Sequence, residues 1–509
     1  MKASLQAPLQ ALALAGLFFL AFRFPAPSGL GVHEPLLAFL VPALALAAAY
    51  RGLKAGWLYL AFLLGLAGIF AFVPATLASK GPMPYAAALG ASLLFWGYEA
   101  LGFLAVTLAG RTAFRRWGFA AGALAAALAL LLWETLAFHV YPWSWGAPYG
   151  ALPLLARSAA FLGSPGLGAW SWGCGGLLAA ALLRPEPLSP ALKAAALWAG
   201  VPTVLGLAWF LLPQGPPRHL DVMMVQPNFD PGVRRPGMEA DHWRRTDRLL
   251  AEAGWPRSGR RTLVLWAESS VLGRDDARPD LRLAEEARSR GVAWLYGTEG
   301  APPGTPYLLW NLVRGEADGA PAFLQAKTEP MPFGEAIPGP AFLREPLERS
   351  LGLLSQVPGP LTDQSTFQVA TPEGPLGIHP LICSEALMPD RTARGLALAG
   401  GDLLANHTND GWFERSAATD LHAAQIRLRA VESGRPLLRA TLTGKSGRFN
   451  ADGTWQLWGE ARSEGGWVFP LDWRVRRTPA RWVGLPALLG AILALGLAAV
   501  AWRARRMSP

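Results

Sequence analysis

The chain has 509 residues, of which 52% are hydrophobic and only 16% are charged. Residues 1–213 and 482–502 are nearly all apolar, whereas residues 214–478 have the composition of a water-soluble domain. This distribution excludes an ordinary soluble protein and predicts an integral membrane protein with one large extramembrane domain. The net charge of +10 suits anionic lipid surfaces. Because the sequence has no basic and aromatic nucleic-acid-binding module, no nucleic-acid partner is expected.

Eight apolar segments are close in length to the ~20 residues that a helix needs to cross a bilayer. They are residues 8–23, 33–50, 56–76, 86–109, 117–138, 158–183, 192–213 and 482–502. The first is expected to be a retained span and not a signal peptide, since no small-residue cleavage site follows it before Phe24 and Pro25. The predicted domains are therefore seven helices in 1–213, an extramembrane domain in 214–478, and an eighth helix with a short basic tail in 479–509.

The basic residues sort the loops to two sides of the membrane. One side carries Lys2, Arg51, Lys54, Arg111, Arg115, Arg116, Arg184, Lys193, Arg503, Arg505 and Arg506. The short loops opposite carry little beyond Arg23, Lys80 and Arg157. The positive-inside rule then predicts that both termini are cytoplasmic and that the large domain faces outward. Four arginines lie just outside the last span, against this trend, and are expected to meet phospholipid head groups: Arg474, Arg476, Arg477 and Arg481.

Two acidic residues, Glu99 and Glu134, fall inside predicted spans. Acidic residues within a membrane are costly and often functional, but near span ends a structural role facing the bundle suits them equally well. In the loop 141–150, Trp143 and Trp145 are expected at the outer membrane interface, where tryptophan is enriched.

Short apolar runs alternate with amphipathic patterns in the extramembrane domain. Strands are predicted at 219–226, 262–268, 292–297, 307–313, 321–326, 376–383, 402–406 and 436–442, and helices at 239–254, 280–290, 389–400 and 416–433. This alternation predicts a layered α/β domain. The Pro- and Gly-rich segment 328–360 has weak periodicity and is predicted to be a long loop, which is uncommon unless it acts as a lid or binding segment.

Three chemically complementary residues end predicted strands: Glu268, Lys327 and Cys383. A carboxylate can take the proton of a thiol, an ammonium can stabilise an oxyanion, and a thiolate can attack a carbonyl. Only six of the 46 basic residues are lysine, and the extramembrane domain has just Lys327 and Lys445. Each residue also has a structural interpretation: Glu268 as the cap of a turn, Lys327 as a solvated strand end, and Cys383 as a small buried residue.

At these residues the chain resembles the apolipoprotein N-acyltransferases, a membrane branch of the nitrilase superfamily. The matching motifs are WAE (266–268), KTEPMPFGE (327–335), ICSE (382–385), NHTNDGWF (406–413) and RAVESGRPLLRAT (429–441). The resemblance implies a nitrilase-like αββα sandwich joined to a polytopic α-helical membrane domain. Ala267 stands where the family usually has proline, and Ser384 where it usually has an aromatic residue.

Carried over by motif, the resemblance implies that Glu268 is the general base, that Lys327 supports the tetrahedral intermediate and that Cys383 is the nucleophile. It adds Glu335 and Glu385 as further active-site acids. The implied reaction moves an acyl chain from a phospholipid through a cysteine thioester to the N-terminal diacylglyceryl-cysteine of an apolipoprotein. The implied location is the cytoplasmic (inner) membrane, with the catalytic domain on the periplasmic side.

The acyl-enzyme must be kept from water, which favours an apolar pocket and a lid. The residues predicted to line the substrate site or form the lid are Phe333, Ile337, Phe342, Leu343, Ser384, Trp412 and Phe413. No cofactor is expected, and His407 and His422 lack a recognisable metal-ligand spacing, so no metal is expected either.

Three other functions remain open on the sequence alone. A membrane-anchored amidase would use the same triad on a small amide, although one anchor would then suffice. A Cys-His hydrolase would pair the thiol with His407 or His422, but such a cysteine usually opens a helix, whereas Cys383 is predicted to close a strand. A transporter with an outer receptor domain is disfavoured by the few intramembrane charges and the lack of visible repeats.

Overall fold

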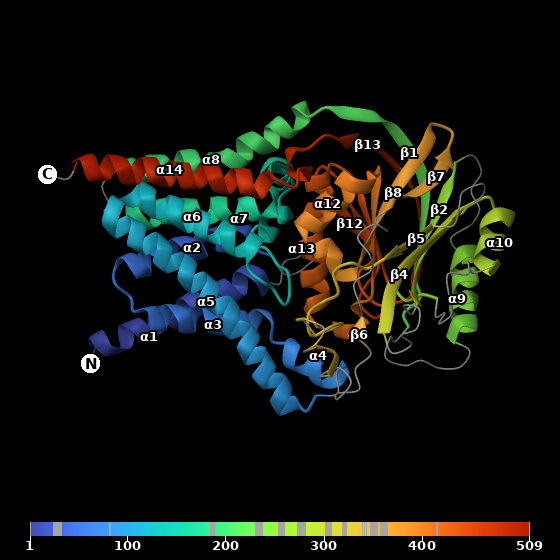
Figure 1. The fold of residues 1–509 in the computed structure, drawn as a ribbon, viewed down its shortest axis with the longest axis horizontal. Coiled ribbons are helices and arrows are strands. Elements are labelled where there is room, and N and C mark those ends of the chain that lie inside the picture. Colours follow the sequence, from blue (N-terminus) through green and yellow to red (C-terminus); the bar gives the residue numbers. More distant parts are fainter. Residues whose placement is uncertain are drawn as a thin grey trace.

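A bundle of helices forms one half of the molecule, and two β-sheets with their covering helices form the other (Figure 1). The computed structural model describes residues 2–23, 33–80, 83–183, 189–229, 238–252, 260–271, 281–300, 308–317, 323–337, 339–340, 342, 344–346, 355–356, 365–413 and 416–507.

A helix lies at each of the eight segments predicted to cross the membrane. The bundle contains α1 (Lys2–Arg23), α2 (Pro35–Tyr50), α3 (Ala55–Ile69), α4 (Val73–Lys80), α5 (Tyr85–Trp117), α6 (Phe119–Leu136), α7 (Pro153–Leu183), α8 (Pro190–Ala208) and α14 (Leu485–Met507). Within the described residues, six helices are long and apolar enough to cross a membrane, or seven if the bent pair α3 and α4 is one span. The apolar helix α2 is shorter, with 16 residues. The chain is an integral membrane protein.

The loop between α6 and α7 does not form the predicted interfacial belt. Trp143 and Trp145 are only 7% and 0% exposed. The ring of Trp145 stacks on Phe18 of α1 with centroids 5.2 Å apart, and its indole Nε1 donates a hydrogen bond to the carbonyl of Ala38. The prediction was wrong because the loop folds back into the bundle, where it buries both rings instead of presenting them to lipid.

The two intramembrane acids hold this region together. Glu134 accepts hydrogen bonds from the backbone nitrogen of Trp145 at 2.6 Å and from the Ser144 hydroxyl at 2.9 Å. The carboxylate of Glu99 lies 2.9 Å from Nδ1 of His139. Both acids therefore face the bundle and satisfy polar groups there, which is the structural role left open by the sequence.

The other half of the molecule contains two sheets. The first has the strand order β13 (Gly465–Arg476), β1 (Gln214–Gln226), β2 (Thr262–Trp266), β3 (Ala293–Gly300), β4 (Leu308–Ala317) and β5 (Phe323–Ala326), with β6 (Ser355–Gln356) beside β4. The second has the order β12 (Trp455–Leu457), β11 (Gly447–Phe449), β10 (Leu437–Thr441), β9 (Leu403–Thr408), β8 (Gly374–Ile382) and β7 (Phe367–Thr371). Strands β1 to β3 and β8 to β10 run parallel, and their neighbours in each sheet run antiparallel.

The sheets pack face to face between two layers of helices, as the predicted αββα sandwich requires. Along β1, Val222 and Met224 point into the core between the sheets. The alternate residues Met223 and Val225 point outward and pack under α9 (Met238–Glu252) and α10 (Leu281–Ser289). Helices α12 (Pro389–Ala399) and α13 (Ala418–Ser433) cover the second sheet. Because side chains alternate along a strand, β1 supplies apolar residues both to the core between the sheets and to the layer under the helices.

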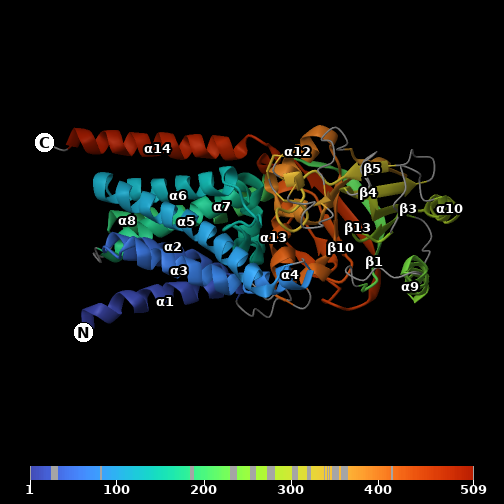
Figure 2. The ribbon, with the colours of Figure 1, turned by 60° about the horizontal axis from the view of Figure 1, so that its bottom comes forward.

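Helix α13 joins the α/β half to the bundle. All of its residues except Asp420 are buried, because one side faces the second sheet and another side faces α7 and the 3-10 turn η1 (Ala147–Ala151). Arg427 donates to the carbonyl of Ala147 at 3.0 Å, and Arg429 donates to the hydroxyl of Ser164 at 2.7 Å. Figure 2 shows α13 lying between the bundle and the sheets. The second sheet, which carries Cys383, is therefore the sheet nearer the membrane helices.

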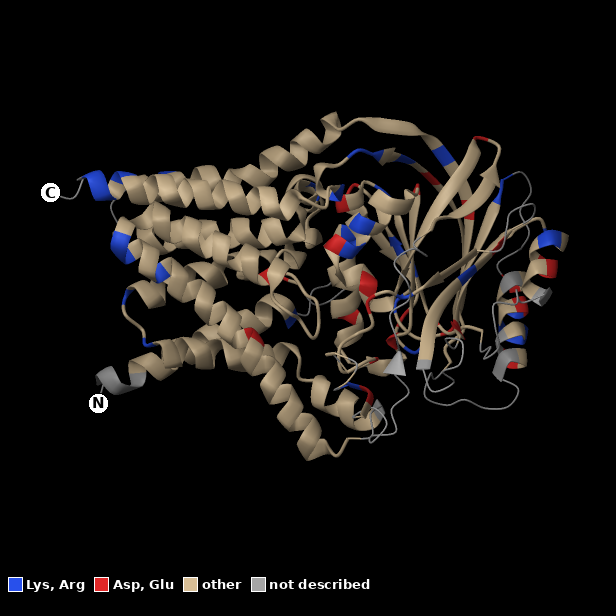
Figure 3. Cartoon of the chain, in the orientation of Figure 1, with Lys and Arg blue, Asp and Glu red and all other residues tan. Residues whose placement is uncertain are grey.

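Charge separates along the long axis of the molecule. Lys and Arg residues gather at the end of the bundle that carries both chain termini, while the body of the bundle is almost free of charge (Figure 3). The α/β half lies at the opposite end. This is the distribution that the positive-inside rule associates with a cytoplasmic end.

Candidate active site

The fold brings the three predicted residues to one place from two different sheets. Glu268 follows β2 and Lys327 follows β5 in the first sheet, whereas Cys383 follows β8 in the second. Each of the three groups acts on the pKa of the others through its charge or a hydrogen bond. Glu268 and Lys327 are 3% and 1% exposed, so these effects operate in a region from which water is largely excluded.

The backbone at Cys383 makes a sharp turn. Strand β8 ends at Ile382, and Cys383 is the first residue of the 3-10 turn η4 (Cys383–Leu387), so the prediction that the cysteine closes the strand was wrong by one residue. Its φ is +49°, a left-handed conformation that is costly for a residue with a Cβ. The hydroxyl of Thr408 on β9 donates to its Sγ at 3.3 Å. The turn thus directs the thiol away from the strand.

Burial raises the pKa of both the Cys383 thiol and the Glu268 carboxyl. Burial raises the pKa of the Cys383 thiol, the charge of Glu268 raises it further, and the charge of Lys327 opposes both. Burial also raises the pKa of Glu268 to about 7, against the lowering effect of Lys327. The resting cysteine is therefore a neutral thiol, and Glu268 is a base whose strength is suited to neutral pH.

Glu335 holds the ammonium group of Lys327. The Nζ of Lys327 donates to both oxygens of Glu335, at 2.7 and 2.6 Å, and the backbone nitrogen of Met331 donates to the same carboxylate at 2.6 Å. Burial lowers the pKa of Lys327, but the carboxylates of Glu335 and Glu268, together with Cys383 in its thiolate form, raise it above its ordinary value. Lys327 is thus a fixed cation beside the thiol.

Glu385, the other predicted acid, is fully buried and holds the loops of the site together. It accepts hydrogen bonds from the backbone nitrogen of Thr328 at 2.8 Å and from that of Ile382 at 2.9 Å. Nε of Arg391 lies 3.2 Å from the same carboxylate and donates to the Thr328 hydroxyl at 2.7 Å. Glu385 therefore links the residue after Lys327 to the residue before Cys383.

We expect Arg391→Met to destabilise the protein by about 3–5 kcal/mol, because it leaves the buried carboxylate of Glu385 without its cation. Arg394→Met is the matched control, since the Arg394 pair with Asp390 is exposed and worth under about 1 kcal/mol. Chemical denaturation of both variants in detergent measures the difference. Equal stability of the two variants would show that Arg391 is not needed to hold Glu385.

Two polar partners of the site were not identified from the sequence. The side-chain amide of Asn311, on β4, donates to Glu268, and Thr408 donates to Cys383 as described. Asn311 lies in the predicted strand 307–313 and is buried, at 3% exposure. A single amide side chain in an otherwise apolar strand was the feature of the sequence that could have identified it. Gly297 on β3 makes room for this arrangement, because a Cβ there would lie 2.5 Å from the Cα of Glu268.

The two histidines considered for a Cys-His hydrolase are engaged elsewhere. Nδ1 of His407 lies 2.7 Å from the carbonyl of Trp266, and burial lowers the pKa of this imidazole to about 4. Nδ1 of His422 lies 3.0 Å from Asp410, which is also paired with Arg439. The carboxylate with the largest effect on the pKa of the Cys383 thiol is that of Glu268, which raises it.

A cavity of about 560 Å³ leads from the thiol into the helical bundle. Its walls come from the bend between α3 and α4, from α4 and α5, the loop before α7, the loop after β5, the turn η4 and the turn after β9. They are Phe70, Phe72, Val73, Thr76, Leu77, Ala91, Leu94, Phe95, Tyr98, Phe138, Val140, Tyr141, Met331, Pro332, Phe333, Gly334, Glu335, Cys383, Trp412 and Phe413. The lining is therefore almost entirely apolar. Two of its residues carry reactive groups, the thiol of Cys383 and the carboxylate of Glu335.

The predicted substrate-binding and lid residues divide into three groups. Phe333, Trp412 and Phe413 line the cavity, and the ring of Phe413 packs edge-on against Phe72 at 5.9 Å. Ser384 is buried behind the thiol at 2% exposure. Ile337 and Phe342 are not among the lining residues, Phe342 being 74% exposed, and Leu343 lies outside the described residues.

Comparison with known proteins gives one family and a consistent set of relatives. Residues 180–466 match the model of a family described as carbon-nitrogen hydrolase. The chain is similar to the apolipoprotein N-acyltransferase of Allorhizobium ampelinum, at 29% identity over 62% of this chain and 60% of that protein. It is also similar to the enzyme of that name from Rhizobium etli, at 30% identity over 65% of this chain and 64% of that protein. The matches thus span less than two thirds of these relatives. A solved amidase from Nesterenkonia sp. is 17% identical over 53% of this chain and 95% of its own, with a TM-score of 0.34.

Proposed function

Because the chain belongs to the carbon-nitrogen hydrolase family, we propose that Glu268, Lys327 and Cys383 form its catalytic triad and that its reaction is an acyl transfer by a ping-pong mechanism. The donor is a phospholipid, and the acceptor is the α-amino group of the N-terminal diacylglyceryl-cysteine of an apolipoprotein. The names of the matched relatives support this acceptor. The product is a triacylated lipoprotein.

The single observation that carries the proposal is the apolar cavity that joins Cys383 to the membrane helices. A pocket for a small amide needs polar groups to orient it, whereas this cavity is lined by residues such as Phe70, Val73 and Leu94. Its volume of about 560 Å³ is ample for a long hydrocarbon chain that enters from lipid. An acyl chain in this cavity would have its carbonyl at the thiol end.

In the first half of the reaction, Glu268 takes the proton of the Cys383 thiol as Sγ attacks the ester carbonyl of the phospholipid. The negative charge that develops on the carbonyl oxygen is stabilised by the ammonium of Lys327, which Glu335 holds in place. The C–O bond then breaks, and the departing lysophospholipid oxygen takes the proton back from Glu268. The acyl group remains on Cys383 as a thioester.

In the second half, the neutral α-amino group of the lipoprotein attacks the thioester carbonyl. Glu268 accepts a proton from the attacking nitrogen, and its pKa of about 7 lets it do so at neutral pH. The C–S bond breaks, and the proton passes to the released sulfur of Cys383. The apolar walls, including Phe333 and Trp412, keep water from competing with the amine.

For the membrane arrangement, we propose that both termini are cytoplasmic and that the α/β domain lies on the periplasmic side of the inner membrane. The gathering of Lys and Arg at the end of the bundle that carries the termini supports this orientation. We propose that the chain has seven membrane helices in residues 1–213, the catalytic domain in 214–478 and the eighth membrane helix in 479–509.

The test is an intact mass of the detergent-solubilised protein after incubation with phospholipid alone. We expect an added mass of one acyl group that hydroxylamine removes, and no such adduct on Cys383→Ala. Absence of the adduct on the unmodified protein, together with hydrolysis of small amides, would replace the acyltransferase by an amidase.

Narrowing the cavity is expected to change the preferred donor. Ala91→Trp places a large ring in the cavity wall, so loading of long acyl chains should fall by at least about tenfold while short chains still load. A single wrong methylene in an apolar pocket already changes specificity by about 10–200-fold. Ala86→Trp, on an exposed part of the same helix, is the control. Intact mass with donors of two chain lengths measures the ratio, and an unchanged ratio in Ala91→Trp would remove the cavity as the acyl site.

A further inference from the structure

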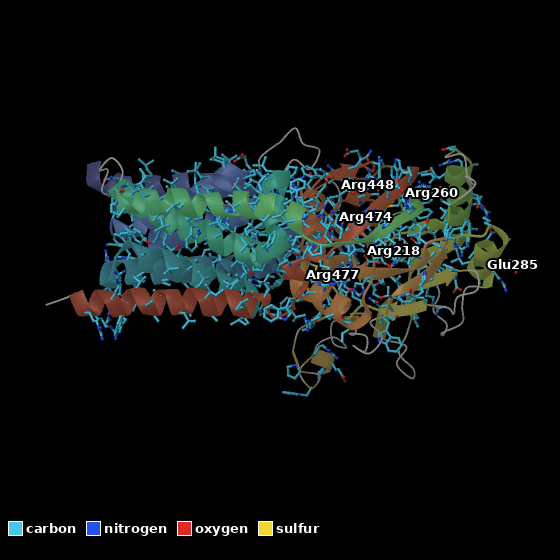
Figure 4. The ribbon with its side chains drawn as sticks, turned by 90° about the horizontal axis from the view of Figure 1, so that it is seen from above. Arg218, Arg260, Glu285, Arg448, Arg474 and Arg477 are labelled. Atoms are coloured by element: carbon cyan, nitrogen blue, oxygen red, sulfur yellow. The ribbon has the colours of Figure 1, made fainter. Side chains whose placement is uncertain are left out.

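A second groove, of about 540 Å³, lies where the α/β domain meets the helical bundle. It is formed by residues around the start of β1, the end of β13, and β11 with the turn that follows it. None of its lining residues belongs to the cavity at Cys383. Figure 4 shows a row of arginines on this face of the α/β domain. The row begins near the end of the bundle and consists of Arg477, Arg474, Arg448, Arg218 and Arg260.

The groove has more positive than negative charge. Within the described part of the chain, its arginines Arg448, Arg474 and Arg476 form no ion pair with a carboxylate. Two acids also line the groove: Asp472, which is paired with His219 at 2.6 Å and with Arg260 at 2.8 Å, and Asp452, whose charge raises the pKa of Arg476. Arg474 and Arg476 each donate through Nη1 to backbone carbonyls at 3.3 Å, and their remaining N–H groups can bind an external anion.

The positive charges are also crowded against one another. The guanidinium of Arg476 lies 3.7 Å from the ring centroid of Trp209, and that of Arg157 lies 5.2 Å from the same ring. Burial lowers the pKa of Arg476, and the charge of Arg157 lowers it further. Two cations against one indole repel each other, and an anion in the groove would relieve this repulsion.

One end of the groove lies beside the end of a candidate membrane span. It begins at the 3-10 turn η2 (Trp209–Leu211), directly after the lipid-facing helix α8. Phe210 and Leu211 in this turn are 55% and 84% exposed. Arg476 pairs with Gln214, the first residue of β1 and three residues beyond the end of this candidate span, so the arginines begin close to the end of the span.

We propose that this groove binds the phosphate group of an anionic phospholipid of the outer leaflet, whose acyl chains lie along α8. A free phosphate would have the same chemistry, but the exposed apolar residues Phe210 and Leu211 below the arginines favour a ligand with a hydrocarbon part. The site lies apart from the acyl cavity and does not depend on the acyltransferase proposal. Its bound lipid would hold the β1–β13 edge of the domain at the membrane surface.

The test measures lipid binding to the full chain in detergent by native mass spectrometry, with phosphatidylglycerol, phosphatidylcholine and inorganic phosphate as separate probes. The test variant is R448Q/R474Q, and Arg474→Glu alone is a second variant that reverses one charge at an exposed position. The control is R244Q/R288Q, which removes two exposed arginines from the distant helices α9 and α10. Lipid in the acyl cavity contributes equally to all variants, so only the differences report on the groove.

We expect the unmodified chain to bind phosphatidylglycerol at least about tenfold more tightly than phosphatidylcholine, and R448Q/R474Q and Arg474→Glu to lose this preference while the control keeps it. Equal binding of phosphatidylglycerol by the test variants and the unmodified chain would overturn the proposal. Displacement of the lipid by inorganic phosphate at the same concentration would assign the groove to a free anion instead. Thioester formation on Cys383, measured in the same samples, should be unchanged in R448Q/R474Q, so failure of this proposal is distinguishable from failure of the acyltransferase.

Discussion

Replacing Glu268 by glutamine is expected to slow thioester formation by about 10²–10⁴-fold, because the amide cannot take the proton of the Cys383 thiol. Burial raises the pKa of the thiol, so few thiolates exist without a base. Glutamine has the shape of glutamate, and its side-chain oxygen can still accept the hydrogen bond from Asn311. The loss should therefore be chemical and not structural. Single-turnover intact mass measures it.

The pH dependence of the unmodified enzyme tests the same group. Burial raises the pKa of Glu268 to about 7, so below that pH an increasing fraction of the carboxyl is protonated and cannot act as a base. The rate of thioester formation should fall about tenfold per pH unit once the pH is well below about 7. Glu268→Gln should lack this slope, and Glu285→Gln, at an exposed position, should retain it. A slope that persists in Glu268→Gln would assign the base to another residue.

Replacing Lys327 by methionine is expected to lower the rates of both half-reactions by about 10²–10³-fold, since each passes through a tetrahedral intermediate with a negative oxygen. The variant also removes the cation that lowers the pKa of the Cys383 thiol. The matched control is Lys445→Met, at the other lysine of the α/β domain, which pairs with Asp420 at 2.7 Å. Its activity should stay within a few-fold of the unmodified enzyme.

A double variant separates chemistry from stability at Lys327. In Lys327→Met the carboxylate of Glu335 is left buried, at 10% side-chain exposure, without its cation, which by itself can destabilise the fold. In K327M/E335Q that charge is absent, and the backbone nitrogen of Met331 can still donate to the side chain at position 335. We expect the double variant to recover thermal stability without recovering thioester formation. Recovery of the rate would show that Lys327 has only a structural role.

Strand ends together with the family resemblance led to the predicted triad. Glu268, Lys327 and Cys383 each follow an apolar run, and such a run ends where a polar side chain must leave the core. The predicted strands and helices of the α/β domain lie within a few residues of the observed ones. The strands β6, β7, β11, β12 and β13 were missed, since they are short or carry polar residues at one edge of a sheet.

Contacts between distant segments could not be predicted. Trp143 and Trp145 have the composition of a membrane-interface loop, but their burial depends on where α1 and α2 lie. The roles of Asn311 and Thr408 likewise depend on which strands become neighbours. Glu385 follows the cysteine by two residues, yet its partners Thr328 and Arg391 come from other loops.

The sequence by itself predicted the membrane spans and the layered α/β domain, because hydrophobic length and periodicity are properties of neighbouring residues. The triad of Glu268, Lys327 and Cys383 was predicted from strand-end chemistry together with the family resemblance, and it stays a prediction. Only the tertiary structure decided that Cys383 opens into an apolar cavity walled by α4, α5 and the bend between α3 and α4, and that the arginines of β11 and β13 share a groove beside the end of α8. Both features are spaces between segments far apart in the chain. Their volume and lining depend on packing in three dimensions, which a local pattern does not contain.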